Sequence, residues 1–391
     1  MKNIYSLLSL CLLCYLGTQA GLNAQISISN GVHSLEISGA ISTYYNHRVL
    51  KEGELNKRKD RFRLRDAQLQ IEGRVRNHIE YEFQIDFADL ALGGLDPENP
   101  GIMDGYIIYK GIKAFDIRAG YGKVPYSRTS LVPFIYSPYW QRAEMLRGEI
   151  FSRRDVGLSL EKTFFRQLIN VMAGVYTGLG EVTLRGDNDP SGQPEYIGRV
   201  EFAYPSRFRY RDIDTRVSPI PMFVIGANGR YANKRLPTGT FFPQGSGAEY
   251  GIKVIDGERL VYGMDMAFQW KGFSTQFEIH QMRATPQNPN SALLQGIPFD
   301  RTQGYFLMGG YLAQMNYFSK PLRSIFSIRF EEMDLNDLVP GNNQRLSAAF
   351  AYQIEGFRSM IKAQYFNILR EESIDPLRWT EQFRIGWQCQ F

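Results

Sequence analysis

The carboxy-terminal stretch that decides the fold is Phe383-Arg384-Ile385-Gly386-Trp387-Gln388-Cys389-Gln390-Phe391. Its apolar residues occupy every second position, and polar residues or glycine occupy the positions between them. A period of two places the two kinds of side chain on opposite faces of a strand. A strand of an outer-membrane barrel has this pattern, because its outer face meets lipid and its inner face meets water. An ordinary half-buried strand fits the stretch equally well, so the rest of the chain has to decide.

The composition favours a barrel and excludes two other classes. Aromatic residues make up 14% of the 391 residues, and charged residues make up 22%. A bundle of membrane helices tolerates far fewer charges, whereas a barrel strand needs apolar residues only at alternate positions. The net charge of +5 is small for this length and argues against nucleic acid as a partner.

The amino terminus predicts a secretory signal over residues 1–24. Lys2 precedes a short apolar run, and Leu22-Asn23-Ala24 supplies a cleavage site before Gln25. The run is shorter than the roughly 20 apolar residues that a membrane span requires. Cleavage leaves Cys389 as the single cysteine, which excludes an internal disulfide and a cysteine metal site. We therefore expect an exported protein of the Gram-negative outer membrane.

From Ser34 onward the chain divides into sixteen alternating segments. The second segment slips by one position at Asp66-Ala67, where a β-bulge would restore the phase. The twelfth, residues 305–317, is apolar on both faces and fits the pattern least well.

The connections between the segments alternate in length. Odd-numbered connections are long and even-numbered ones are short, as expected for outer loops and inner turns of a membrane barrel. One even-numbered connection, from Pro205 to Pro221, breaks the rule because it is long. The sequence thus predicts an all-β fold: one 16-stranded antiparallel transmembrane β-barrel over residues 25–391.

The longest outer connection, residues 123–154, is the candidate constriction. About 16 strands leave an aqueous channel inside a barrel, so an element that narrows it has to be sought. This connection contains four aromatic residues between positions 134 and 140, which gain little in water but would pack on a barrel wall. We predict that it folds into the interior; an aromatic loop at the outer membrane interface is the alternative. Its basic candidates are Lys123, Arg128, Arg142, Arg147, Arg153 and Arg154.

Charged rows on the first strands face the same interior. Arg61, Arg63 and Arg65 share one face of the second segment, and an arginine row at a constriction would favour anions. The next segment carries carboxylates on its inner face, namely Glu80, Glu82 and Asp86. The two rows would neutralise one another if they paired across the hairpin, and the sequence leaves this alternative open.

Several motifs resemble the phosphate-selective porin O/P family. They are Phe62-Arg63-Leu64-Arg65-Asp66-Ala67-Gln68-Leu69, Glu80-Tyr81-Glu82-Phe83-Gln84-Ile85-Asp86-Phe87, Ile117-Arg118-Ala119-Gly120-Tyr121-Gly122-Lys123-Val124-Pro125-Tyr126, Arg154-Asp155-Val156-Gly157, Ile197-Gly198-Arg199-Val200 and Tyr262-Gly263-Met264-Asp265. The resemblance implies a sixteen-stranded outer-membrane porin, commonly a homotrimer, whose selective members use an arginine ladder and loop lysines to prefer anions. No phosphate site can be matched residue by residue.

The expected function is passive diffusion of small hydrophilic, anionic or polar solutes. The expected partners are those solutes, outer-membrane lipid and the barrel-assembly machinery, for which Trp387 and Phe391 would form the carboxy-terminal signal. A secretion- or partner-associated barrel, or a barrel hydrolase, is the alternative. Catalysis has weak support, because His280 with Glu278 two residues earlier is most simply a solvated pore pair. The pattern predicts neither a metal site nor a cofactor.

Overall fold

The computed structural model describes residues 26–51, 60–90, 101–146, 152–178, 180, 192–234, 257–287, 302–334, 336–338, 341–370 and 379–391. The predicted signal, its cleavage site and most of the long odd-numbered connections lie outside these residues.

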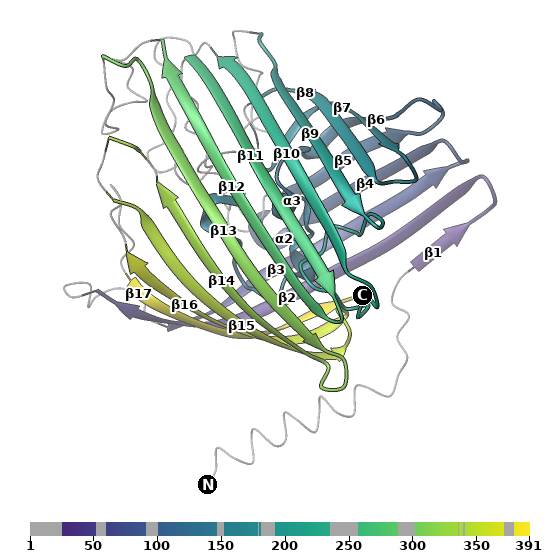
Figure 1. Ribbon diagram of the computed structural model, residues 1–391. Helices are drawn as coiled ribbons and strands as arrows, with labels where there is room; N and C mark the ends of the chain where they lie inside the picture. The colour runs from purple at the N-terminus through teal and green to yellow at the C-terminus, as the bar shows by residue number, and fades with distance from the viewer. Residues whose placement is uncertain are drawn as a thin grey trace.

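Sixteen antiparallel strands form a closed barrel (Figure 1). The last strand pairs with the first, with Gln390 opposite Ala40. The predicted fold class is therefore confirmed. The strands are β2 (His33–Leu50), β3 (Asp60–Val75), β4 (Ile79–Asp86), β5 (Ile102–Tyr109), β6 (Asp116–Lys123), β7 (Arg154–Phe164), β8 (Ile169–Tyr176), β9 (Glu195–Tyr204), β10 (Met222–Lys234), β11 (Gly257–Trp270), β12 (Phe273–Pro286), β13 (Phe306–Ser319), β14 (Ser324–Asp334), β15 (Asn343–Glu355), β16 (Ser359–Arg370) and β17 (Trp379–Gln390).

The alternating side chains divide as a membrane barrel requires. On β3, Phe62 and Leu64 face outward and are 83% and 50% exposed, whereas Arg65 is buried. The predicted bulge is confirmed, because Ser42 lies opposite Asp66 whereas Thr43 lies opposite Leu64, which leaves Arg65 as the extra residue.

The short turns lie at one end of the barrel, which we call the inner end; the opposite end is the outer end. At the turn between β11 and β12, Lys271 and Gly272 both have positive φ, 48° and 85°. Two such residues form the tight turn that matches the twist of paired strands.

Elements outside the barrel wall are short. Strand β1 (Ile26–Ser29) pairs with β2 next to the place where β17 ends. The helical turns are α2 (Phe87–Leu90), α3 (Arg128–Leu131), η2 (Phe134–Tyr136) and η3 (Glu144–Leu146). No helix among the described residues has the length and apolar character to cross a membrane.

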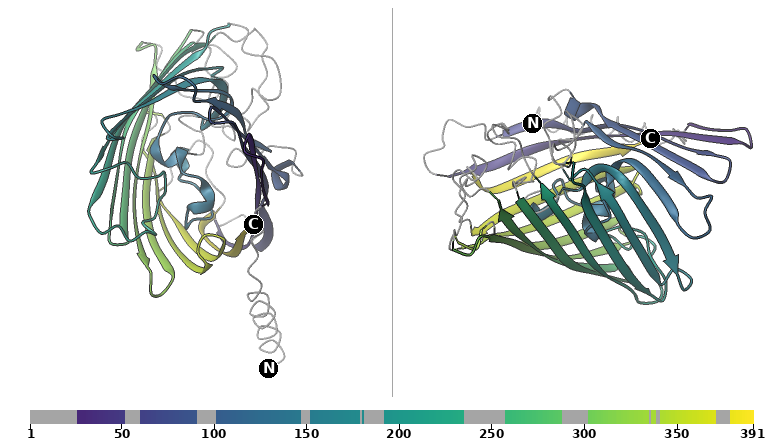
Figure 2. Two further views of the ribbon diagram at one scale, coloured as in Figure 1. Left: turned by 90° about the vertical axis from the view of Figure 1, so that its right-hand side faces the viewer. Right: turned by 90° about the horizontal axis from the view of Figure 1, so that it is seen from above.

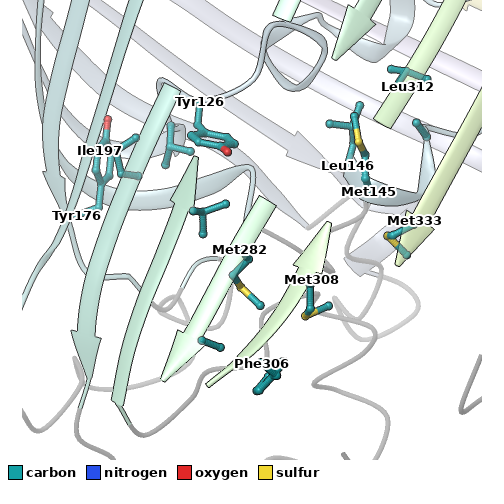
Figure 3. Packing of buried hydrophobic residues seen from close by; sticks show 14 residues of the cluster. Tyr126, Met145, Leu146, Tyr176, Ile197, Met282, Phe306, Met308, Leu312 and Met333 are labelled. Carbon is teal, nitrogen blue, oxygen red and sulfur yellow. The ribbon is translucent and has the colours of Figure 1, made fainter. Parts of the chain in front are cut away.

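The alternating pattern predicted polar side chains along the whole interior, but part of the interior is apolar. An apolar cluster lies inside the wall near the outer end, and Figure 3 shows its residues. Phe306, Met308 and Leu312 point inward from β13 and pack in the same cluster as Met145 and Leu146 of the connection between β6 and β7. This contact explains why residues 305–317 are apolar on both faces: one face meets lipid and the other meets a segment folded inside.

Candidate functional site

The connection between β6 and β7, of which residues 124–146 and 152–153 are described, folds into the barrel; we call it the long loop. Figure 2, left, shows its blue helical turns inside the ring of strands. Near its start, the Ser127 hydroxyl and the Thr129 backbone N–H donate to the Glu278 carboxylate on β12, both at 2.6 Å. The prediction that this segment enters the interior is confirmed.

His280 belongs to the same anchor. Its Nδ1 lies 3.0 Å from the Tyr126 hydroxyl of the long loop, and its Nε2 lies 3.0 Å from Glu278. His280 and Glu278 are 1% and 0% exposed. The interpretation of this pair as solvated was wrong, because the long loop covers it.

The long loop then crosses to the closing strands through Trp140, which is fully buried. Its backbone N–H donates to Gln364 at 2.7 Å, and its indole N–H donates to the Lys362 carbonyl at 3.0 Å, both on β16. The Lys362 ammonium in turn donates to the Ser137 carbonyl at 3.2 Å and lies 4.5 Å from the Trp140 ring. The loop therefore spans the interior from β12 to β16.

Most basic candidates of the long loop are buried in contacts of their own. Arg154 forms an ion pair with Asp104 at 3.0 Å, and Lys123 donates to the Leu131 carbonyl at 3.4 Å. Arg142 donates to the Val132 carbonyl at 3.2 Å, and Arg153 is 2% exposed. Arg147 lies outside the described residues. These groups thus hold the loop's shape, and those that also line the cavity described below add positive charge to it.

Burial affects the loop's ionisable groups in the expected direction. Desolvation raises the pKa of the Tyr126 and Tyr139 phenols, so both remain neutral at physiological pH. The Tyr139 hydroxyl accepts a hydrogen bond from Ser327 at 2.7 Å. Desolvation also lowers the pKa of Arg128, against the opposing effect of Glu201.

A second segment, residues 205–221 between β9 and β10, enters from the inner end; we call it the inner segment. The Asp212 carbonyl accepts hydrogen bonds from Ser274 at 2.8 Å and Asn316 at 2.9 Å, and its carboxylate accepts one from Gln276 at 2.7 Å. These three partners face inward from β12 and β13. The one connection that broke the length rule is therefore long because it folds into the barrel.

The two inward segments touch. The Arg128 guanidinium of the long loop donates to the Arg209 carbonyl at 3.1 Å and lies 4.6 Å from the Phe208 ring. In return, the Arg211 guanidinium of the inner segment lies 4.7 Å from the Tyr136 ring. Together they cross the interior, since their contacts to the wall extend from Glu161 on β7 to Gln388 on β17.

Arginines gather on the outer half of the opposite wall. Register places Arg61 beside Asn46 and Arg63 beside Tyr44 on β2, while Arg384 on β17 lies on the other side of Asn46. Arg65 and Arg384 both donate to the Trp140 carbonyl at 3.2 Å. With Arg48, which faces Gln382 across the same strands, they form the arginine cluster: Arg48, Arg61, Arg63, Arg65 and Arg384.

Sequence reasoning found three of these five arginines and missed the two on β2 and β17. The alternation of the last strand already placed Arg384 on the inner face. What the pattern lacked was the register that brings β17, β2 and β3 side by side.

The carboxylates of β4 lie on the inner half of this wall. Register sets Asp86 opposite Gln68, Glu82 opposite Glu72, and Glu80 opposite Arg74. Glu80 accepts from Arg74 at 2.8 Å and from Lys110 at 2.6 Å. Backbone register places Arg61 and Arg63 opposite β2 beyond the bulge, whereas Arg65 forms an ion pair with Asp66 at 3.3 Å; neutralisation of the arginine row by the β4 acids stays an open alternative.

A cavity of about 730 Å³ lies between the inward segments and this wall. On the wall side, Glu36, Glu72 and Glu82 are directly opposite one another across β2, β3 and β4. On the other side it is lined by Phe134, Tyr136, Arg142 and Arg209, among others. The cavity thus lies along β2 to β6 on the inner half, beside these carboxylates, while the arginine cluster lies further toward the outer end.

Comparison of the sequence with known families gives one match. The family model described as phosphate-selective porin O and P matches residues 43–190, the part of the chain that contains the arginine row of β3 and the long loop. No curated protein is significantly similar in sequence.

Solved structures with the same fold are outer-membrane proteins. The outer membrane channel DcaP of Acinetobacter baumannii is 11% identical with a TM-score of 0.58, covering 93% of this chain and 99% of that one. OmpF of Salmonella typhi, in complex with daunomycin, is 12% identical with a TM-score of 0.58, over 94% and 100%. OmpT of Vibrio cholerae in a trimer form is 8% identical with a TM-score of 0.55, over 92% and 100%. At these identities the likeness establishes the fold.

Proposed function

We propose that this outer-membrane channel for small solutes prefers anions. The chain forms a closed 16-stranded barrel, and the family model of phosphate-selective porin O and P matches its residues 43–190. The solutes would be small hydrophilic anions, inorganic phosphate among them.

The arginine cluster carries this proposal. Its guanidiniums come from adjacent rows of β17, β2 and β3 on the outer half, and Arg61 and Arg63 lie beyond the last β3 residue that pairs with β4. Arg65 and Arg384 hold the Trp140 carbonyl, so the cluster lies where the long loop approaches the wall. A row of positive groups at a narrowing lowers the free energy of an entering anion and raises that of a cation.

The test is the reversal potential of single channels in a KCl gradient. We expect wild-type protein to be anion-preferring and Arg61→Gln/Arg63→Gln to lose much of that preference. Two charges about 4 Å apart interact in water by about 1 kcal/mol, so each arginine should change the anion-to-cation permeability ratio by roughly fivefold. Arg76→Gln, at the exposed turn between β3 and β4, is the matched control. A double variant that keeps the wild-type ratio would refute the role of the cluster.

Further expectations belong to the same proposal. We propose a homotrimer, cleavage of the signal after Ala24, and recognition of Trp387 and Phe391 by the barrel-assembly machinery. Trp387 is exposed on the outer face, and the Phe391 backbone pairs with Gly39 in both directions, at 2.8 and 2.9 Å. We propose no catalytic role, since the buried His280 is occupied by Tyr126 and Glu278. Silent barrels in planar bilayers would favour the alternative of a partner-binding barrel.

A further inference from the structure

The inner segment carries four arginines, and their surroundings differ. Arg207 forms ion pairs with Glu161 at 3.3 Å and Glu201 at 3.4 Å. Arg211 stacks on Tyr136 of the long loop. Arg209 and Arg216 are both exposed, but only Arg209 lines the cavity between the inward segments and the β2–β6 wall.

The position of Arg209 is fixed from the long loop. Its carbonyl accepts the hydrogen bond from Arg128, whose guanidinium is also stacked between Phe208 at 4.6 Å and Tyr210 at 5.1 Å. The backbone on either side of Arg209 is therefore held by one buried cation. Its own side chain remains exposed to the cavity, at the edge where the two inward segments meet.

The other basic groups at this cavity are engaged. Arg154 pairs with Asp104, Arg358 pairs with Glu355 at 3.5 Å, and Arg118 lies 4.2 Å from the Tyr106 ring. Lys123 and Arg142 donate to loop carbonyls. Arg209 differs from them, because its backbone is bound and its guanidinium faces the cavity.

Strands β2 to β4 of the opposite wall carry a row of carboxylates. Glu36, Glu72 and Glu82 face one another in a single row, an arrangement that concentrates negative potential at the inner half. An anion that has passed the arginine cluster meets this row before it leaves. A positive side chain across the cavity from the carboxylates would offset their repulsion of the anion.

We propose that Arg209 is a specificity-determining residue of the channel: its guanidinium contacts anionic solutes at the inner end of the path and offsets the carboxylate row. The inner segment is then the second half of the constriction. This inference rests on the proposed function, since it assigns one more residue to the same solute path.

The test uses charge introduced at one position of the assembled protein. Arg209→Cys is made in a Cys389→Ser background, because Cys389 is an exposed free thiol. Single channels are recorded in a KCl gradient before and after a negatively charged thiosulfonate reagent is added to one chamber or the other. A separate set of unmodified channels receives a positively charged reagent instead. Arg216→Cys in the same background is the matched control, as an exposed arginine of the same segment that does not line the cavity.

We expect the negative reagent to lower the anion-to-cation permeability ratio of the Arg209→Cys channel by roughly fivefold or more, and the positive reagent to raise the ratio of separate, unmodified Arg209→Cys channels toward the wild-type value. The effect should appear faster from one chamber than from the other. An Arg209→Cys channel that responds no more than Arg216→Cys would overturn the inference. If the cysteine variant does not assemble, Arg209→Lys should keep the wild-type ratio and Arg209→Gln should lower it; equal ratios would overturn the inference as well.

The wild-type channel tests the proposed function independently of the Arg209 variants. A wild-type channel without anion preference refutes the proposed preference. A response confined to Arg209 would still establish that this side chain lies in the solute path.

Discussion

The long loop and the inner segment enter the barrel from opposite ends and are held in different ways. The long loop is fixed by a buried carboxylate, by Trp140 and by an apolar cluster that draws on six strands and the loop itself. The inner segment is held by polar contacts to Asp212, by Asp214, which accepts from Ser218 at 2.8 Å and from Gly272 at 3.0 Å, and by a smaller apolar cluster in which Ile213 packs with side chains of β13 to β16. Both segments combine polar and apolar anchors, but the long loop contributes five residues to the larger cluster, so we expect the inner segment to be displaced more easily.

The largest expected effect is on the long loop. Glu278→Ala removes the acceptor for Ser127 and for both donors of Thr129. Hydrogen bonds to a charged group contribute about 1.5–3 kcal/mol each, so the start of the loop loses several kcal/mol of anchoring. We expect a severalfold increase in single-channel conductance and new cleavage of the loop by trypsin.

The control for this variant is Glu258→Ala, on the neighbouring strand β11, whose exposed carboxylate accepts from Tyr231 at 3.3 Å on the exposed side. It should leave conductance and trypsin resistance unchanged. Wild-type conductance in Glu278→Ala would mean that the apolar cluster alone holds the loop.

The inner segment should respond less. Asp212→Ala removes the hydrogen bonds that its carboxylate accepts from Gln276, Ser137 and Gln314, while the backbone carbonyl keeps Ser274 and Asn316. We expect a conductance increase smaller than that of Glu278→Ala. Arg209→Gln should then change the permeability ratio less in the Asp212→Ala background than in wild type. Equal effects of Arg209→Gln in the two backgrounds would show that Asp212 does not position Arg209.

The fold was predictable because the membrane imposes one simple requirement on every strand. Residues such as Phe62 and Leu64 contact lipid whatever the interior holds, so the period of two survives along the chain. The exception was β13, where Phe306 and Met308 also face an apolar surface. That surface is supplied by Met145 and Leu146, far away in the sequence, and no local pattern contains it.

The constriction was predictable only in part. The aromatic residues of the long loop correctly indicated an inward fold, and the same mixture of arginine and aromatic residues occurs at Arg207-Phe208-Arg209-Tyr210-Arg211. The inner segment was recognised only as an exception in length. The separation of Arg61 and Arg63 from Glu80 and Glu82 depends on register beyond the bulge, which alternation does not determine.

A pH dependence should distinguish the two inward segments further. Burial raises the pKa of the Asp212 carboxyl, against opposing contributions that include Arg142 and the hydrogen bond from Gln276. Such a carboxyl binds its proton more readily when docked, so docking is most stable below the ordinary aspartate pKa of about 3.9 and weakens as pH rises through the raised value. We expect conductance fluctuations to increase over that window. Asp212→Asn should abolish the change; fluctuations with the same pH dependence in that variant would assign it to another group.

The smallest effect concerns a buried charge on β16 that contacts the long loop. Lys362 is fully buried on β16, where its ammonium donates to the Ser137 carbonyl and lies 4.5 Å from the Trp140 ring and 5.6 Å from the Phe134 ring. Lys362→Met keeps the volume and removes both the cation–π contacts and the cost of burying a charge, two terms of opposite sign. We expect a change in the free energy of unfolding within about 1 kcal/mol, measured by urea titration in detergent micelles, and unchanged conductance. A loss of several kcal/mol, or a conductance increase like that of Glu278→Ala, would make the ammonium rather than the carboxylate and the apolar cluster the main anchor of the long loop.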